Sequence, residues 1–155
     1  MQLRHEKIAP GQGHAAGRQL LAEMYRELTG APMPEIVTTP RGKPYFTSGN
    51  LHFSISHTKH HVFCALSENP VGIDAEEMDR KIDLRLADKI LSGPEAVHFE
   101  KAADKRLTLL KFWVLKEAAA KLSGAGLQGY PNHTDFSPDD PRVTEIDGCL
   151  VAVLA

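Results

Sequence analysis

Two predicted elements of this chain carry charged side chains at positions where a soluble domain normally has apolar ones. Asp74 and Glu76 are two residues apart in Gly72-Ile73-Asp74-Ala75-Glu76, which reads as a strand, so both carboxylates point to the same face. In the predicted helix 105–123, Glu117 and Lys121 continue a stripe that begins with apolar residues (Leu107, Leu110 and Val114). Three carboxylates and a lysine in such positions suggest a site for a metal ion and a phosphate.

The place of Glu117 on that stripe favours a metal ion. Leu110 and Val114 bury the same face, so the Glu117 carboxylate should point inward, where an unpaired charge is costly unless it binds a cation. Mg²⁺ or Mn²⁺ would suit it, with phosphate oxygens and water completing the octahedron. The alternative stays open, because Asp-x-Glu is common at exposed strand ends and Glu117 with Lys121 is also a routine helix pair worth roughly 0.2–0.5 kcal/mol.

Ser56 ends another predicted strand and His57 follows it, so a hydroxyl and an imidazole can donate to a phosphate there. The alternative is an ordinary turn histidine close to His60 and His61. A zinc site has less support, because no cysteine or further histidine has suitable spacing. Lys43 lies in a short Gly-Lys-Pro loop and supplies one cation, which says little alone.

Hydrophobic spacing and turn signals predict the elements that must position these residues. Helices are expected at 14–28, 82–91 and 105–123, with another beginning at Ser92–Glu95. Strands are expected at 36–39, 51–56, 62–66 and 71–75, and a last hairpin at 142–146 and 149–154 around an Asp-Gly turn. The stretches 40–50 and 127–141 should be mostly loop, and no strand or helix is assigned to 1–13. Strands and helices without regular alternation favour an α+β fold.

Composition limits the classes of partner and the location. A chain of 155 residues with a formal charge of −2 has no basic excess to track a nucleic-acid backbone, so nucleic acid is set aside as a partner. No apolar run approaches the roughly 20 residues of a membrane span, and the polar start lacks a signal-type segment. Cys64 and Cys149 sit in apolar runs and fit buried free thiols better than a disulfide. We therefore expect no membrane contact and a cytoplasmic location.

Several short motifs, taken in order, carry a resemblance to a known family. They are Gly42-Lys43-Pro44, Phe53-Ser54-Ile55-Ser56-His57-Thr58, Gly72-Ile73-Asp74-Ala75-Glu76, Phe112-Trp113-Val114-Leu115-Lys116-Glu117-Ala118, and then Lys121 with Gly124-Ala125-Gly126-Leu127. They resemble the ordered motifs of the 4′-phosphopantetheinyl transferase superfamily, and more closely its surfactin-synthetase-activating branch. The match runs from about residue 42 to 127. The G-I-D-x-E and W-x-x-K-E-A-x-x-K patterns make it specific.

This resemblance implies a fold and a reaction. The fold would be a single domain, 1–155, with two small pseudo-symmetric halves (about 12–68 and 70–155), each with a helix packed on antiparallel strands. The reaction would move 4′-phosphopantetheine from coenzyme A to a serine of an apo acyl- or peptidyl-carrier protein and release 3′,5′-ADP. Mg²⁺, or Mn²⁺ in its place, would be the cofactor. The alternatives are a metal-dependent nucleotide phosphohydrolase and a non-catalytic module that binds carrier proteins or coenzyme A.

The resemblance also assigns roles to residues at matching positions. Asp74, Glu76 and Glu117 would hold the metal, while Glu117, Lys121 and Asp74 would form the catalytic group, with Glu117 taking the serine proton. Coenzyme A would contact Arg18, Lys43, Ser56, His57 and Lys121, and Lys116 would support Glu117 or touch a phosphate.

The chain departs from the larger members of the family in two ways. It lacks an assigned first strand and first helix of the N-terminal half, and Ser54 stands where the family usually has asparagine. A monomer with its site inside one chain is favoured, with a homo-oligomer as the alternative.

Overall fold

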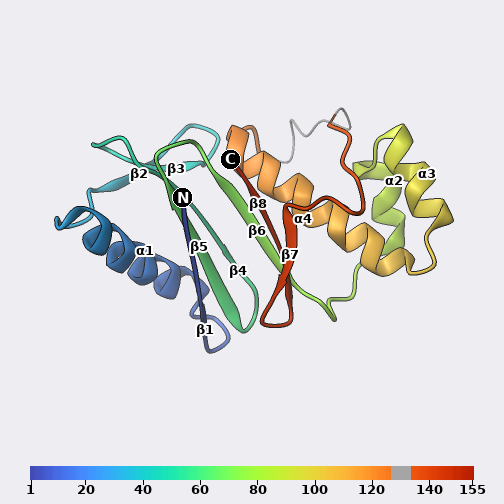
Figure 1. Cartoon of the computed structure of the whole chain (residues 1–155), viewed down its shortest axis with the longest axis horizontal. Coiled ribbons are helices and arrows are strands. Elements are labelled where there is room, and N and C mark those ends of the chain that lie inside the picture. Colours follow the sequence, from blue (N-terminus) through green and yellow to red (C-terminus); the bar gives the residue numbers. More distant parts are fainter. Residues whose placement is uncertain (127–133) are drawn as a thin grey trace.

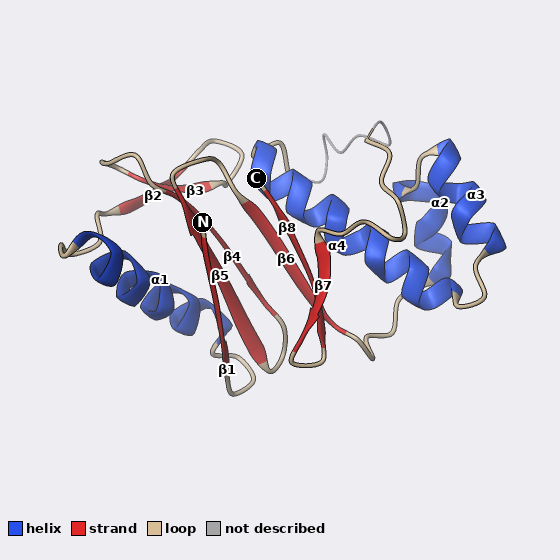
Figure 2. Cartoon of the chain, viewed as in Figure 1, coloured by secondary structure: helices blue, strands red, loops and turns tan. Residues whose placement is uncertain are grey.

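The computed structural model describes residues 1–126 and 134–155, and it consists of antiparallel strands flanked by helices (Figures 1 and 2). The long helix α1 lies on one side of the strands and the long helix α4 on the other. This arrangement confirms the predicted α+β class. The pseudo-symmetry of two halves and the division of the chain into them stay predictions. Within the described ranges, no helix combines the length and the apolar character that crossing a membrane requires.

The first sheet has the strand order β1-β5-β4, and every pairing is antiparallel. Its strands are β1 (Gln2–Lys7), β5 (His61–Ser67) and β4 (His52–His57). Helix α1 (Gly13–Thr29) covers it with the buried side chains of Leu20, Leu21 and Met24, and Gly30 ends the helix in a left-handed conformation. A small separate sheet pairs β2 (Ile36–Thr38) with β3 (Pro44–Phe46). The predicted helix and the predicted β4–β5 hairpin are therefore confirmed.

The second sheet has the order β6-β8-β7, again antiparallel. Its strands are β6 (Gly72–Glu77), β8 (Cys149–Leu154) and β7 (Val143–Ile146). The β7–β8 turn confirms the Asp-Gly prediction, because Asp147 and Gly148 have φ angles of 53° and 76°. Positive φ at both central residues matches the twist of a two-residue hairpin.

The remaining helices lie beyond this second sheet, and α4 (Lys105–Ser123) packs directly across it (Figure 1). The others are η1 (Leu84–Leu86), α2 (Ala87–Ile90) and α3 (Gly93–Lys101). A capping box between Ser92 and Glu95, with a proline in the first turn, starts α3 as predicted. The helical stretch expected at 82–91 is shorter at both ends, because Asp83 (φ −71°, ψ 117°) and Leu91 (φ −84°, ψ 139°) are both extended.

The core follows these layers, which run helix, sheet, sheet, helix. Apolar residues of the first sheet pack under α1, and those of the second pack under α4. A third cluster lies between the two sheets and brings Phe63 and Ala65 of β5 against Val71 and Ile73 of the β6 region. Burying a side chain of the Val, Ile or Phe type stabilises by about 1.5–3 kcal/mol. This central cluster therefore fixes the two sheets against each other.

Two elements were not expected from the sequence. The expectation of no strand in the first residues is wrong, because Gln2–Lys7 pairs with β5 along its full length. Residues 40–50 are mostly loop as predicted, yet Pro44–Phe46 forms β3. The two buried cysteines are free thiols, as expected. Residues 127–133 of the predicted loop 127–141 lie outside the described residues.

Candidate active site

Asp74 lies on β6, and this strand packs closely against α4. A Cβ atom added to Gly72 would lie 2.0 Å from the Ala118 carbonyl oxygen, so only glycine allows this approach. One turn further along α4, Lys121 Nζ reaches Asp74 Oδ1 at 2.7 Å. A strand carboxylate and a helix ammonium that are 47 residues apart in the chain therefore meet.

The other side of Asp74 is held by β4. The Ser56 hydroxyl donates to Asp74 Oδ1 (3.0 Å) and accepts the Ala75 N–H (3.1 Å), while the Ser54 hydroxyl accepts the Ile73 N–H (3.1 Å). These hydroxyls satisfy N–H groups on β6, which is an edge strand of the second sheet in the part of the chain that the structure describes. The Asp74 carboxylate therefore lies where β4 of the first sheet meets β6 of the second.

Asp74 is buried and only partly satisfied. Its Oδ2 atom has no hydrogen-bond partner among the described residues. Burial raises the pKa of the Asp74 carboxyl above its usual value, while the charge of Lys121 opposes that rise. A buried carboxylate oxygen without a partner is the kind of atom that a bound cation would satisfy.

Glu76 shares the strand face with Asp74, as the alternation predicted. It forms an ion pair with Arg80 and accepts the Trp113 indole N–H on Oε1 (3.1 Å). The Arg80 guanidinium also lies 5.5 Å from the centre of the Trp113 ring. Burial raises the pKa of Glu76, the charge of Asp74 adds to the rise, and Arg80 opposes it.

Glu117 lies on α4 one turn before Lys121 and is partly buried. Burial raises the pKa of its carboxyl to about 7, the charge of Asp74 adds to the rise, and Lys121 opposes it. Glu76 contributes a smaller rise in the same direction. The three carboxylates therefore interact electrostatically, and Asp74 raises the pKa of both Glu76 and Glu117. Such shifts are typical of cation-binding and acid–base sites.

The donor set fits a hard divalent cation, although the side chains are arranged around resident basic groups. In the ranges that the structure describes, no three His, Cys, Asp or Glu side chains are close enough together to hold a metal ion as they stand. Lys121 forms an ion pair with Asp74 Oδ1, and Arg80 forms one with Glu76 Oε1. The oxygen donors are those that Mg²⁺ prefers, and the unpartnered Asp74 Oδ2 would gain a partner from it.

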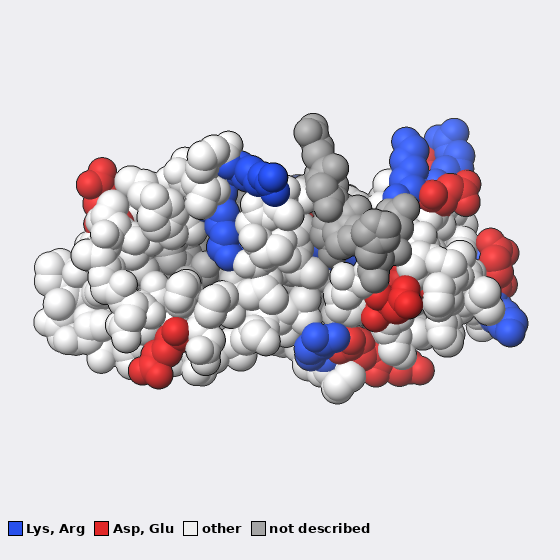
Figure 3. All heavy atoms as spheres, turned by 90° about the horizontal axis from the view of Figure 1, so that it is seen from above, with Lys and Arg blue, Asp and Glu red and all other residues white. Residues whose placement is uncertain are grey.

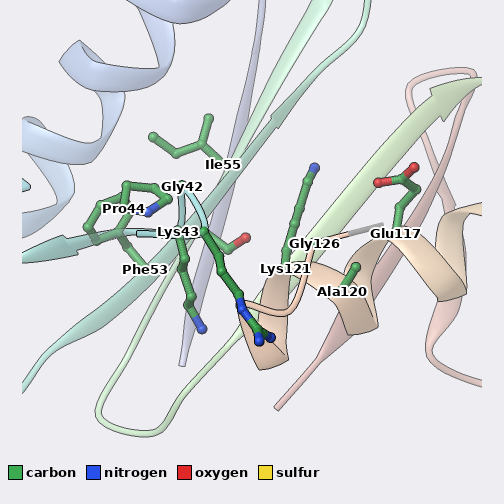
Figure 4. A pocket seen from close by; sticks show the side chains of 12 residues that line it. Gly42, Lys43, Pro44, Phe53, Ile55, Glu117, Ala120, Lys121 and Gly126 are labelled. Atoms are coloured by element: carbon green, nitrogen blue, oxygen red, sulfur yellow. The ribbon is translucent and has the colours of Figure 1, made fainter. Parts of the chain in front are cut away.

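A pocket of about 290 Å³ opens beside Glu117 and Lys121. Figure 4 shows both side chains rising from α4 on one side, with the Gly42–Pro44 loop and with Phe53 and Ile55 of β4 opposite. The described residues that line it are Arg41, Gly42, Lys43, Pro44, Phe53, Ser54, Ile55, Glu117, Ala120, Lys121, Gly124 and Gly126. Seen from above, basic side chains gather in and beside a hollow in the middle of the molecule (Figure 3). An anionic ligand with an apolar part suits such a lining.

The residues predicted to contact coenzyme A do not all line this pocket. Lys43 lines the pocket, but its ammonium donates to the Leu122 carbonyl at the end of α4, and burial lowers the pKa of Lys43. His57 lines a neighbouring cavity of about 530 Å³ beside Glu76 and Arg80. Arg18, on α1, is not among the described residues that line either one. The roles given to these residues stay predictions.

Lys116 is a buried residue of α4. Its ammonium lies 2.8 Å from Glu95 Oε2, and both side chains are almost fully inaccessible, at 2% and 0% exposure. Glu95 also accepts the N–H groups of Ser92 (2.8 Å) and Phe136 (2.9 Å). The Lys116–Glu95 pair therefore ties α4 to the start of α3, and Lys116 is not among the described residues that line the pocket. Its role beside Glu117 stays a prediction.

Sequence reasoning missed Arg80, Trp113 and Glu95 as parts of this arrangement. The spacing of four residues between Glu76 and Arg80 was a signal for an ion pair. Because the chain leaves β6 after Glu77, this spacing did not predict that the two side chains would meet. Glu95 was recognised only for its place in the start of α3.

Comparison with known proteins decides the family. Residues 70–149, more than half of the chain, match the family described as ACPS, the 4′-phosphopantetheinyl transferase superfamily. This chain belongs to that superfamily. The matched range contains β6 and α4, so it includes all three carboxylates and Lys121.

Named relatives extend the similarity beyond that range. The 4′-phosphopantetheinyl transferase psf-1 of Bacillus pumilus is 31% identical over 134 residues, which is 83% of this chain and 57% of that one. The transferase gsp of Aneurinibacillus migulanus is 35% identical over 88 residues (56% and 36%), and AcpT of Salmonella typhi is 33% identical over 114 residues (70% and 57%). The chain thus spans between about a third and three fifths of the length of these superfamily members.

Proposed function

We propose that this chain transfers 4′-phosphopantetheine from coenzyme A to a serine of an apo acyl- or peptidyl-carrier protein and releases 3′,5′-ADP. The observation that carries the proposal is the contact of Lys121 with Asp74 beside Glu117, at the edge of a pocket with basic residues in its lining. Membership of the superfamily supports the same reaction. The carrier, the oligomeric state and a cytoplasmic location remain predictions, with a monomer favoured.

Asp74, Glu76 and Glu117 would hold Mg²⁺, or Mn²⁺ in its place, and the ion would supply charge stabilisation at the pyrophosphate of coenzyme A. Lys121 stands next to this group and can turn its ammonium toward a phosphate oxygen. Negative charge develops on both phosphates as the bond between them breaks, so a fixed ammonium stabilises the transition state more than the ground state.

Glu117 is the proposed base. The carrier serine oxygen forms a bond to the phosphorus that carries pantetheine, the bond from that phosphorus to the bridging oxygen breaks, and 3′,5′-ADP leaves with the electron pair. The serine proton passes to Glu117, directly or through water. In the metal-free protein the pKa of Glu117 is about 7, which is near the optimum for a base that works at neutral pH.

The pocket would receive the nucleotide end of coenzyme A, with Arg41 and Lys121 facing its phosphates. Ser56 would act by holding Asp74, because its hydroxyl is already bonded to that carboxylate and to a main-chain N–H. His57, which lines the cavity beside Glu76 and Arg80, would meet the pantetheine or carrier side of the substrate.

The direct test mixes the protein, coenzyme A, Mg²⁺ and an apo carrier protein, and follows the mass of the carrier. A gain of one phosphopantetheine group is the expected result, and Asp74→Ala and Glu117→Ala should each lose at least about a hundredfold in rate. The matched control is Glu145→Ala, which removes an exposed carboxylate on β7.

Other outcomes point to the other classes of protein. Breakdown of coenzyme A that ignores the carrier would identify a phosphohydrolase. Binding of coenzyme A or carrier without turnover, unaffected by Glu117→Gln, would identify a non-catalytic module. Near-normal rates in Asp74→Ala would remove that residue from the metal site.

A further inference from the structure

Arg80 occupies the place beside Glu76 that a metal ion would need. The guanidinium forms an ion pair with Glu76 Oε1, and the same oxygen accepts the Trp113 indole N–H at 3.1 Å. The Glu76 side chain is only 20% exposed and the Arg80 side chain 38%. Glu76 Oε1 therefore interacts with two donors, the Trp113 indole and the positively charged Arg80 guanidinium.

The main chain that carries Arg80 is fixed, although the side chain has room to move. Arg106 on α4 donates to the Met78 carbonyl (2.8 Å) and to the Arg80 carbonyl (3.1 Å). Beside the guanidinium lies the cavity of about 530 Å³ that Glu76 and Arg80 help to line together with His57. Arg80 can therefore leave Glu76 by rotation of its own side chain, without a backbone rearrangement.

The balance of charge explains why Arg80 is held there. Asp74, Glu76 and Glu117 interact electrostatically, and the basic groups acting on Glu117 are Lys121 and Arg80. Without a metal ion, these two cations limit the repulsion among the three carboxylates. A divalent cation brings more charge to the same place and repels a guanidinium at contact distance.

We propose that Arg80 is a built-in counter-ion that Glu76 must release before it can bind a divalent cation, so that Arg80 weakens and thereby sets the metal affinity of the site. This inference rests on the proposed function, since it assumes that Glu76 is a metal ligand. Trp113, the single tryptophan of the chain, reports on the exchange because Arg80 lies over its ring.

The experiment titrates the full chain with Mg²⁺ alone, by calorimetry and by tryptophan emission at constant ionic strength. Arg80→Met keeps the aliphatic stem on the indole and removes the charge. It should bind Mg²⁺ about tenfold more tightly than the parent chain, and Arg80→Gln should change affinity in the same direction. Lys81→Met removes an exposed charge from the next residue and should change the affinity by less than about twofold.

The emission measurement separates exchange at Trp113 from a general charge effect. The parent chain should show a saturable change in emission with the same midpoint as the calorimetric titration. In Arg80→Met the emission before titration should already differ, and Mg²⁺ should change it less.

Unchanged or weaker Mg²⁺ binding by both Arg80 variants, an equal gain in Lys81→Met, or an emission response in Arg80→Met as large as that of the parent would each overturn the inference. A carrier that still gains phosphopantetheine under those outcomes would leave the proposed function standing. A parent chain that binds no Mg²⁺ and modifies no carrier would refute both.

Discussion

Lys116→Met tests the buried ion pair that supports α4 next to Glu117. Lys116 Nζ and Glu95 Oε2 are 2.8 Å apart and both side chains are inaccessible, so the substitution leaves a buried carboxylate with its main-chain donors alone. Breaking such a pair from one side costs about 3–5 kcal/mol. At about 2–4 °C per kcal/mol for a chain of this size, the melting temperature should fall by about 6–20 °C.

The assay is urea and thermal unfolding of the variant beside two companions. Lys111→Met removes a partly exposed lysine from the same helix and should stay within about 0.5 kcal/mol of the parent chain. The double variant with Glu95→Gln removes the buried charge but loses one acceptor for a main-chain N–H. It should therefore be more stable than Lys116→Met and lie about 1–3 kcal/mol below the parent. A loss of less than about 1 kcal/mol in Lys116→Met, or a double variant no more stable than the single one, would refute this reasoning.

Three further predictions concern the site and the strand beneath it. In metal-free buffer, the contribution of Glu117 to folding stability should fall as pH rises from about 4.5 to 7, because its pKa is about 7 in the folded chain and has the ordinary value of 4.5 in the unfolded chain; unfolding at pH 5 and 8 with a chelator should show Glu117→Gln stabilising the chain more at pH 8. Gly72→Ala should destabilise the fold at or beyond the upper end of about 1–3 kcal/mol, because the new Cβ meets the Ala118 carbonyl oxygen; a melting temperature equal to the parent's would contradict that contact. Ser56→Ala should cost about 1–3 kcal/mol in urea unfolding by leaving the Ala75 N–H unpaired, and an unchanged urea midpoint would show that the hydroxyl contributes nothing.

The sequence predicted those elements whose own residues carry a periodic or turn signal. Helix α4 begins and ends where the apolar stripe and Gly124 indicate, and Asp147 with Gly148 makes the expected hairpin turn. The alternation along β6 correctly placed Asp74 and Glu76 on one face and Ile73 on the other. In each case the information is local.

What the sequence could not predict depends on contacts between distant segments. Lys116 follows a helical pattern that allows exposure, and only its meeting with Glu95, 21 residues earlier, makes burial of the charge acceptable. The pairing of Arg80 with Glu76 depends on how the chain turns after β6 and on the indole of Trp113. Short strands such as β3 are similarly fixed by their partner strand and not by their own composition.

Strand β1 has a free side, since it stands at the end of its sheet with β5 as its one neighbour in the described residues. Main-chain groups along such a border can recruit a strand from another molecule and start intermolecular aggregation. Arg4, His5, Glu6 and Lys7 place polar and charged side chains of both signs on this strand, so an incoming strand would have to desolvate them. The polar residues that gave β1 no hydrophobic strand signal therefore also disfavour pairing of this edge with a strand of a neighbouring molecule.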